Sequence, residues 1–152
     1  EECKGLKTIV SIYKTVTDRT NIVSLISTLY SPVFGFNEND LAEYRSKGGS
    51  VKLEFNKQYR NLGIDKALAS LVETSKQIQK LTPSALYEKI MDDYEIFNYV
   101  PSDDLEVIYY VLELIRGEEN SGNIVNYEDA VKFLDDLIEA NKMPINIGFE
   151  SN

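Results

Sequence analysis

Residue types that often carry out chemistry are unevenly represented in this chain of 152 residues. Histidine is absent and Cys3 is the single cysteine, which excludes His-dependent triads, His-ligated metals and thiolate zinc clusters. Carboxylates are plentiful, and many occur as adjacent pairs. These pairs are Asp92-Asp93, Asp103-Asp104, Glu118-Glu119, Glu128-Asp129 and Asp135-Asp136. To hold a metal or act as general acids, they would have to converge in a pocket that perturbs them.

Helix formation explains these pairs better than catalysis does. Asp103 and Asp104 follow Ser102, a residue that commonly caps a helix, and negative charge in a first turn favours the helix dipole. A second pair follows Asn126 in the same way. The Gly48-Gly49 pair lacks the spacing of a phosphate-binding loop and indicates a helix end. We therefore expect no catalytic residue, metal or cofactor in this chain.

Basic and aromatic residues are the candidates for binding. Most of the ten tyrosines and six phenylalanines fall on apolar stripes and are expected in the core. Tyr44 and Tyr59 are the expected exceptions because basic residues surround them in the sequence. These basic residues are Arg45, Lys47, Lys52, Lys57 and Arg60. Such a mixture can hold a nucleic-acid backbone and stack on bases, and it also suits an ordinary solvated surface.

The net charge of −9 is concentrated in one part of the chain. Residues 1–89 hold 13 Lys and Arg against 10 Asp and Glu, a balance of +3. Residues 90–152 hold 3 against 15, a balance of −12. Since phosphate binding needs cations, only the first part can approach DNA, whereas the second suits a solvated face or a basic partner.

Apolar residues recur at three- and four-residue spacing, which predicts an all-α domain of six or seven helices over residues 1–152. Asn21, Asn37, Thr82, Ser102 and Asn126 are the expected N-caps, and Gly117 is the expected end of the helix after Ser102. The stripe of that helix includes Tyr109. The residues expected to be buried are Leu25, Ile26, Leu29, Leu68, Leu71, Leu112, Leu134 and Leu137.

Two segments depart from this helical pattern. Val51, Leu53 and Phe55 alternate with polar residues, which fits a short strand or a helical turn equally well. The tail from Ile145 to Asn152 is expected to be extended. No apolar run is long enough to span a membrane, and no leader peptide is evident, so we expect a cytoplasmic protein with no membrane partner.

Residues 29–41, LYSPVFGFNENDL, resemble a signature of UvrD/Rep-like superfamily I DNA helicases, most of all the AddA- and RecB-type helicase–nucleases. In that family a helix ends at a Ser-Pro turn, an apolar segment with Phe-Gly follows, and an acidic helix begins. The resemblance extends over Leu6–Tyr44 and, more weakly, over Tyr127–Asn152. It departs from many relatives at Tyr30, where they carry a basic residue.

The resemblance implies the largely helical insertion subdomain called 2B. Because the chain begins at Glu1 and stops at Asn152 without an obvious cap, we expect a piece of a longer protein. ATP and Mg²⁺ would bind elsewhere in that parent, an ATP-dependent helicase or exonuclease of DNA repair and recombination. This piece would contact duplex DNA, the remaining motor domains or a partner subunit.

Two questions stay open on the sequence. Ser31 either ends a helix before Pro32 or donates a hydrogen bond to a DNA phosphate. The chain as a whole is either this helicase subdomain or a free-standing helical adaptor that binds a protein through its acidic face. A Walker A motif upstream in the same reading frame would distinguish the two.

Overall fold

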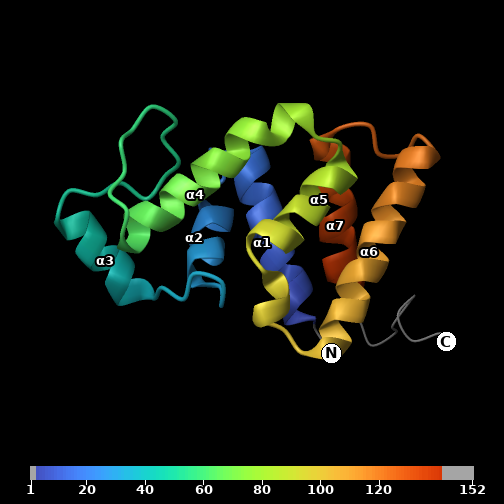
Figure 1. The fold of residues 1–152 in the computed structure, drawn as a ribbon, viewed down its shortest axis with the longest axis horizontal. Helices are drawn as coiled ribbons and strands as arrows, with labels where there is room; N and C mark the ends of the chain where they lie inside the picture. Colours follow the sequence, from blue (N-terminus) through green and yellow to red (C-terminus); the bar gives the residue numbers. More distant parts are fainter. Residues whose placement is uncertain (1–2, 142–152) are drawn as a thin grey trace. The chain divides into compact units, whose positions relative to one another are not determined.

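The computed structural model describes residues 3–141, which form seven α-helices and two short 3₁₀ turns (Figure 1). The helices are α1 (Lys4–Thr17), α2 (Ile22–Tyr30), α3 (Glu38–Ser46), α4 (Gly63–Gln77), α5 (Pro83–Asp93), α6 (Ser102–Asn120) and α7 (Tyr127–Asn141). The 3₁₀ turns are Ile78–Lys80 and Ile96–Asn98. No described residue lies in a strand, so the predicted all-α fold is confirmed.

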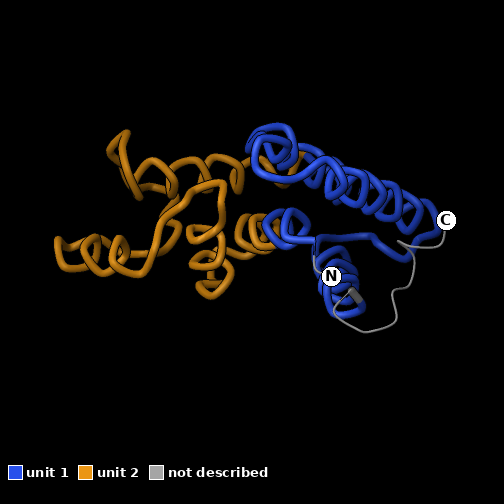
Figure 2. Tube along the Cα trace, turned by 90° about the horizontal axis from the view of Figure 1, so that it is seen from below, with its two compact units in different colours: residues 1–10, 81–152 blue, residues 11–80 orange. Residues whose placement is uncertain are grey.

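The chain divides into two compact units, which Figure 2 draws in different colours. Unit 1 takes the chain up to Val10 and from Leu81 onward, and unit 2 takes Ser11–Lys80. Helix α1 therefore contributes residues to both units. The expectation of a single domain over residues 1–152 stays a prediction.

Four of the five predicted N-caps are present. In each, the cap side chain accepts a hydrogen bond from a backbone amide three residues later. The distances are 3.1 Å at Asn21, 2.9 Å at Asn37, 3.2 Å at Thr82 and 2.8 Å at Asn126. At Asn37 the cap is reciprocal, because the Asp40 carboxylate accepts from the Asn37 amide at 2.8 Å. These caps fix where α2, α3, α5 and α7 begin.

Both predicted ends of α6 were wrong. The N-cap is Pro101, whose extended backbone lets its carbonyl accept from the amides of Asp104 and Leu105, so Ser102 is already helical. Helix α6 also continues past Gly117 to Asn120. A glycine ends a helix when its φ is positive, and that conformation occurs at Gly122, where φ is 80°.

Unit 2 is built on a helical hairpin of α1 and α2. The buried hydroxyls of Thr15 and Thr28 lie 3.1 Å apart, and Ser75 of α4 donates to the Val16 carbonyl at 2.8 Å. The apolar core of this unit includes Ile12, Tyr13, Val16, Leu25, Leu29, Leu41, Leu68 and Leu71. This core supports α3, α4 and the chain between them.

The strand interpretation of residues 51–55 is wrong, and the helical-turn alternative is not seen either. Val51 and Leu53 are buried as alternation requires, but the segment belongs to the irregular loop between α3 and α4. A strand needs a partner to satisfy its amides and carbonyls, and none of the described residues supplies one. The predicted extended tail from Ile145 lies outside the described residues.

Unit 1 is held together by buried polar contacts as well as an apolar core. Helices α5 and α6 pack along each other, and the buried Tyr87 hydroxyl donates to the Ile108 carbonyl at 2.9 Å. The Glu119 carboxylate accepts from both the amide and the hydroxyl of Ser84 at 2.8 and 2.7 Å, in the first turn of α5. One acid of the Glu118-Glu119 pair thus has a structural role.

Burial agrees with the prediction at most positions. Leu25, Leu29, Leu68, Leu71, Leu112 and Leu134 are buried, whereas Ile26 and Leu137 are only half-buried. The expectation that most tyrosines and phenylalanines lie in the core was wrong, since the buried ones among the described residues are Tyr13, Tyr87 and Tyr94. Tyr109 is exposed because the buried stripe of α6 runs through Ile108, Val111, Leu112 and Ile115 instead.

Candidate nucleic-acid interface

All five basic candidates lie on one stretch of unit 2, which runs from the last turn of α3 through the loop before α4. Arg45 is in the last turn of α3, and Lys47 is its C-cap. Lys52, Lys57 and Arg60 lie on the loop between α3 and α4. All five residues are exposed, although the Lys57 side chain is only 33% exposed. The sequence therefore identified a continuous segment, which we call the basic loop, residues 45–60.

Ser31 lies apart from the basic loop, at the C-terminus of α2. Its side chain is buried, with 8% of the residue exposed, and its hydroxyl donates to the Thr28 carbonyl at 2.7 Å. Its backbone amide also bonds to the Thr28 carbonyl. The proton that could reach a phosphate is thus used inside the turn, which favours the helix-ending interpretation of Ser31.

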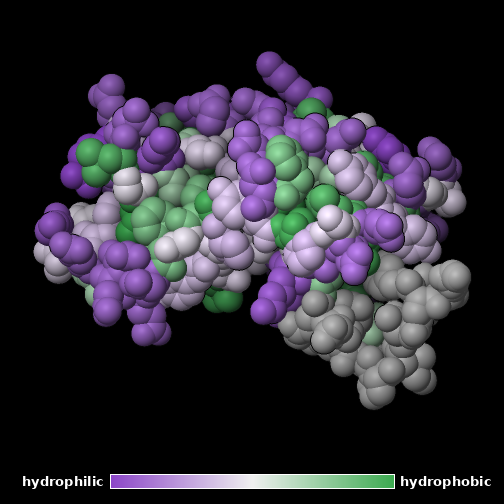
Figure 3. All heavy atoms as spheres, turned by 60° about the horizontal axis from the view of Figure 1, so that its bottom comes forward, coloured by the Kyte–Doolittle hydropathy of each residue, from purple (hydrophilic) through white to green (hydrophobic). Residues whose placement is uncertain are grey.

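The turn after Ser31 forms an apolar hollow. Val33, Phe34 and Phe36 line a groove of about 310 Å³ together with Ala67 of α4. Figure 3 shows apolar residues (green) gathered on part of unit 2, at the left of the view, bordered by hydrophilic residues (purple). The segment after Ser31 therefore contributes apolar side chains to this groove. The cation that lines the groove is Lys66, which belongs to α4.

A network around one buried carboxylate fixes the basic loop to the helices. Asp65, in the first turn of α4, is only 6% exposed. It accepts hydrogen bonds from the Tyr44 hydroxyl at 2.6 Å, from Arg60 Nε at 2.7 Å and from the Arg60 amide at 3.3 Å. These donors, Arg60 foremost, lower the pKa of Asp65 below its ordinary value of 3.8. Burial, and then the bond to Asp65, raises the pKa of the Tyr44 phenol.

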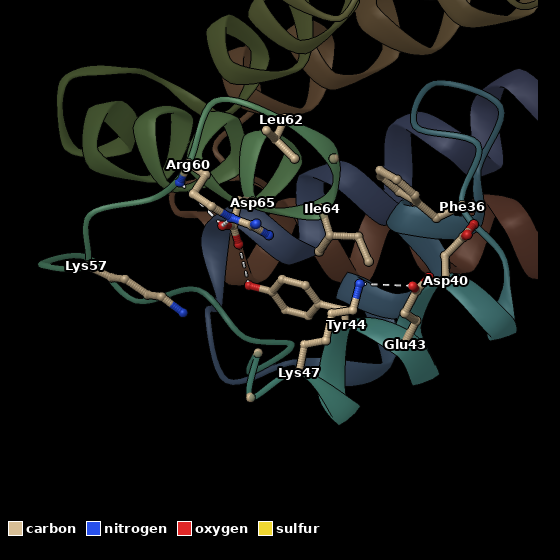
Figure 4. Close-up of a pocket in the computed structure, with 13 residues that line it drawn as sticks. Phe36, Asp40, Glu43, Tyr44, Lys47, Lys57, Arg60, Leu62, Ile64 and Asp65 are labelled. Atoms are coloured by element: carbon tan, nitrogen blue, oxygen red, sulfur yellow. Dashed lines mark hydrogen bonds and ion pairs between the residues drawn. The ribbon is translucent and has the colours of Figure 1, made fainter.

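An open cleft of about 470 Å³ surrounds this network. Figure 4 shows the Tyr44 ring in the cleft, with its hydroxyl directed at Asp65. The Arg60 side chain is also directed at Asp65, and the Lys47 amino group is directed at Glu43. The backbone of Gly49 lies against the Tyr44 ring, where a Cβ atom would collide with it. The glycine that the sequence marked as a helix end is therefore also required for this close approach.

Most cations of the basic loop already have acidic partners. Lys47 pairs with Glu43 at 3.1 Å, Lys57 with Glu54 at 3.6 Å and Arg60 with Asp65 at 2.7 Å. Within residues 3–141, Arg45 and Lys52 make no ion pair. The Lys47 pair is largely exposed, so it is weak and can be exchanged for a phosphate at low cost. The Arg60 pair is different, because its partner is buried.

The two tyrosines expected outside the core, Tyr44 and Tyr59, hold the basic loop in place through their hydroxyls. Both are half-buried. The Tyr59 hydroxyl accepts from the Glu54 amide at 3.1 Å and donates to the Lys52 carbonyl at 3.4 Å, which holds the loop in its bend. Tyr44 is tied to Asp65 as described above. Their hydroxyls therefore organise the segment that carries the cations.

Asp65 is the residue that sequence reasoning missed. Its signal was available, because a lone acid stands beside Ile64 in the apolar stripe that continues through Leu68. An acid in such a stripe indicates a buried carboxylate that needs donors. The identity of those donors was not readable, since Tyr44 is 21 residues away. No group of three or more His, Cys, Asp or Glu side chains placed to hold a metal ion occurs among the described residues.

Comparisons with protein-family models, with curated proteins and with solved structures find no match for this chain. None of the described helices is long and apolar enough to cross a membrane.

Proposed function

We propose that this chain is a non-catalytic accessory subdomain of a larger ATP-dependent DNA helicase or helicase–nuclease that acts in DNA repair and recombination. It resembles the 2B insertion of UvrD/Rep-like enzymes. The chain contributes a DNA-contacting surface, and ATP and Mg²⁺ bind to the motor domains of the parent. The parent would act in the cytoplasm.

The arrangement around Leu29–Leu41 supports the proposal most strongly. Helix α2 ends at Tyr30, the Ser31-Pro32 turn follows, and the reciprocal cap at Asn37 starts an acidic α3 with buried Leu41. This is the order of elements that the resemblance implies for residues 29–41. The turn is closed by backbone bonds from Gly35 to Ser31 and from Phe36 to Leu29.

The proposed DNA contact consists of Arg45, Lys47, Lys52 and Lys57. All four are exposed, and the two without ion pairs in the described chain, Arg45 and Lys52, can meet phosphates directly. Lys47 can exchange its exposed acidic partner for a phosphate with the release of counterions. Ser31 and Arg60 are left out of this surface because each is bonded inside the fold.

The test is a charge reversal with a matched control. Arg45, Lys47, Lys52 and Lys57 are changed together to Glu. The control reverses the same number of charges at exposed lysines away from the basic loop. These are Lys4, Lys76, Lys80 and Lys132. Duplex binding is measured by fluorescence anisotropy at low and moderate salt, and circular dichroism confirms that each variant folds.

We expect the basic-loop variant to lose the low-salt binding and the control to keep most of it. Each phosphate contact removed lowers the salt slope by about 0.9 on duplex DNA. Equal loss in the two variants would show that net charge alone governs binding, and the proposed surface would then be wrong. If even the chain joined to its motor domains binds no duplex, docking to a partner subunit becomes the better account.

A separate test addresses catalysis. Because no phosphate-binding loop is present, the purified chain should give no saturable heat of ATP binding in calorimetry and no phosphate release. Stoichiometric ATP binding at micromolar affinity would contradict the accessory role.

A further inference from the structure

Helix α6 carries two different faces. Its inner face packs into unit 1 through Ile108, Val111, Leu112 and Ile115, all buried. Its outer face repeats at three and four residues and is exposed throughout. We call this outer face the acidic–aromatic stripe, and it consists of Asp103, Glu106, Tyr109, Tyr110 and Glu113.

The two tyrosines are the unusual members of this stripe. Tyr109 is 57% exposed and Tyr110 is 44% exposed, although both are near the middle of a 19-residue helix. Within the described residues, the Tyr109 side chain makes no hydrogen bond or ring contact. Tyrosine offers large, rigid contact area at small entropic cost, and it is enriched where protein partners bind most tightly. The positions thus suit a contact outside the chain.

The charge around these tyrosines defines the chemistry of the partner. Helix α6 contains six acidic residues and one basic residue, Arg116. Arg116 bonds to Glu113 of the stripe at 2.6 Å and to Glu88 at 3.1 Å, which leaves the stripe acids Asp103 and Glu106 without that cation. The acids would repel a nucleic acid. A cationic side chain would be attracted both to the carboxylates and to the faces of the tyrosine rings.

We infer that the acidic–aromatic stripe docks an arginine-rich helix of a partner protein. Arginine satisfies both parts of the stripe, because its planar guanidinium forms paired hydrogen bonds with carboxylates and stacks on aromatic rings. The inference is independent of the proposed DNA contact. It applies equally to a helicase subdomain and to a free-standing adaptor, since it uses residues of α6 alone.

The experiment uses the full 152-residue chain and a defined probe. The probe is a fluorescently labelled, alanine-based helical peptide with arginine at every third or fourth position, and a second peptide carries glutamine in place of arginine. Three variants of the chain are compared by anisotropy: Y109S/Y110S, E106Q/E113Q, and the control E128Q/E139Q. The control removes two exposed charges from α7 and leaves the stripe intact.

We expect the arginine peptide to bind the parent chain and the glutamine peptide not to bind. Y109S/Y110S should weaken arginine-peptide binding by about tenfold or more, although its charge is unchanged. E106Q/E113Q should weaken binding several-fold more than E128Q/E139Q does. If Y109S/Y110S fails to fold by circular dichroism, the comparison of the two charge variants still decides the matter.

Three results would overturn the inference: absence of binding to the parent chain at low salt, equal binding by folded Y109S/Y110S and the parent, or equal weakening by the two charge variants. The last would show that the peptide responds only to net charge. The basic-loop variant described above should bind the peptide at least as well as the parent. Failure of the DNA proposal and failure of this inference are therefore distinguishable.

Discussion

The basic loop of unit 2 and the acidic–aromatic stripe of unit 1 use the same residue types in opposite ways. In the basic loop, Tyr44 and Tyr59 are braces, and three of the five cations are paired with acids. In the stripe, Tyr109 is exposed, and the helix that carries the stripe holds six acids and one arginine. Charge counted along a sequence therefore overstates the number of unpaired cations in the basic loop, because it does not show which of them are bonded to acids.

Each of the two surfaces lies on a unit with its own buried apolar core. Leu29→Ala in unit 2 and Leu112→Ala in unit 1 should each lower the free energy of unfolding by about 2–5 kcal/mol, because both remove buried methyl groups. Val23→Ala, at an exposed position, should change it by less than about 0.5 kcal/mol. Urea unfolding provides the measurement. A negligible effect at either leucine would mean that the corresponding unit lacks the described packing.

Asp65 is a buried carboxylate that accepts hydrogen bonds within the fold, whereas Glu106 is an exposed carboxylate on the surface. Asp65→Ala removes the acceptor for Tyr44 and Arg60 and should lower the free energy of unfolding by about 1–3 kcal/mol. Glu106→Ala should change it by no more than about 0.5 kcal/mol. If chemical denaturation gave the same loss of unfolding free energy for both variants, Asp65 would not be bonded within the fold as described.

Acid titration sharpens the same contrast. The folded-state pKa of Asp65 is below its ordinary value of 3.8, so its contribution to stability is fully present above that pH. The contribution is lost as pH falls through the lower folded-state value. We expect the unfolding free energy of the parent chain to fall more steeply below about pH 4 than that of Asp65→Asn. Parallel curves between pH 2 and 6 would show that the carboxylate is not held as described.

Removing single hydroxyls compares the tyrosines directly. Tyr59→Phe deletes the bonds to the Glu54 amide and the Lys52 carbonyl and should cost about 1 kcal/mol of folding stability. Tyr109→Phe should be nearly neutral, since no described residue bonds to its hydroxyl. Thermal unfolding of the two variants measures the difference, and a reversed order would contradict the assignment of brace and exposed ring.

The smallest effect is expected at an exposed ion pair of the basic loop. Lys47→Gln breaks the pair with Glu43 and should lower the unfolding free energy by only about 0.3–0.5 kcal/mol. Urea unfolding at low and high salt measures it. A decrease in the unfolding free energy above about 1 kcal/mol would mean that the fold depends on the Lys47–Glu43 pair, so Lys47 could not exchange Glu43 for a phosphate.

Local rules accounted for much of the fold. Asn21, Asn37 and Thr82 were predictable as caps because the bonding partner is three residues away in the chain. Ser102 failed because Pro101 can start a helix with its carbonyl alone. The loop between α3 and α4 was least predictable, since its shape depends on hydrogen bonds made by Asp65 and Tyr59, which a periodic pattern does not encode.

The candidate site was predictable only in part for the same reason. Spacing identified the basic stretch from Arg45 to Arg60, but it did not reveal that Arg60 is committed to Asp65 across the first turn of α4. It also placed Tyr109 in the core, because Tyr109 is three residues before Leu112, whereas the buried position on that side of the stripe is Val111. Long-range partners, rather than residue types, decide which side chains are available to bind.

The most direct test of the central claim is a residue-resolved titration. A ¹⁵N-labelled chain is mixed with a short DNA duplex at low salt, and amide chemical shifts are followed. We expect the largest changes at Arg45, Lys47, Lys52 and Lys57, with little change at Glu106 and Tyr109 of α6. Shifts centred on α6, or the same small shift across the whole chain, would contradict the assignment of the basic loop as the DNA-contacting surface.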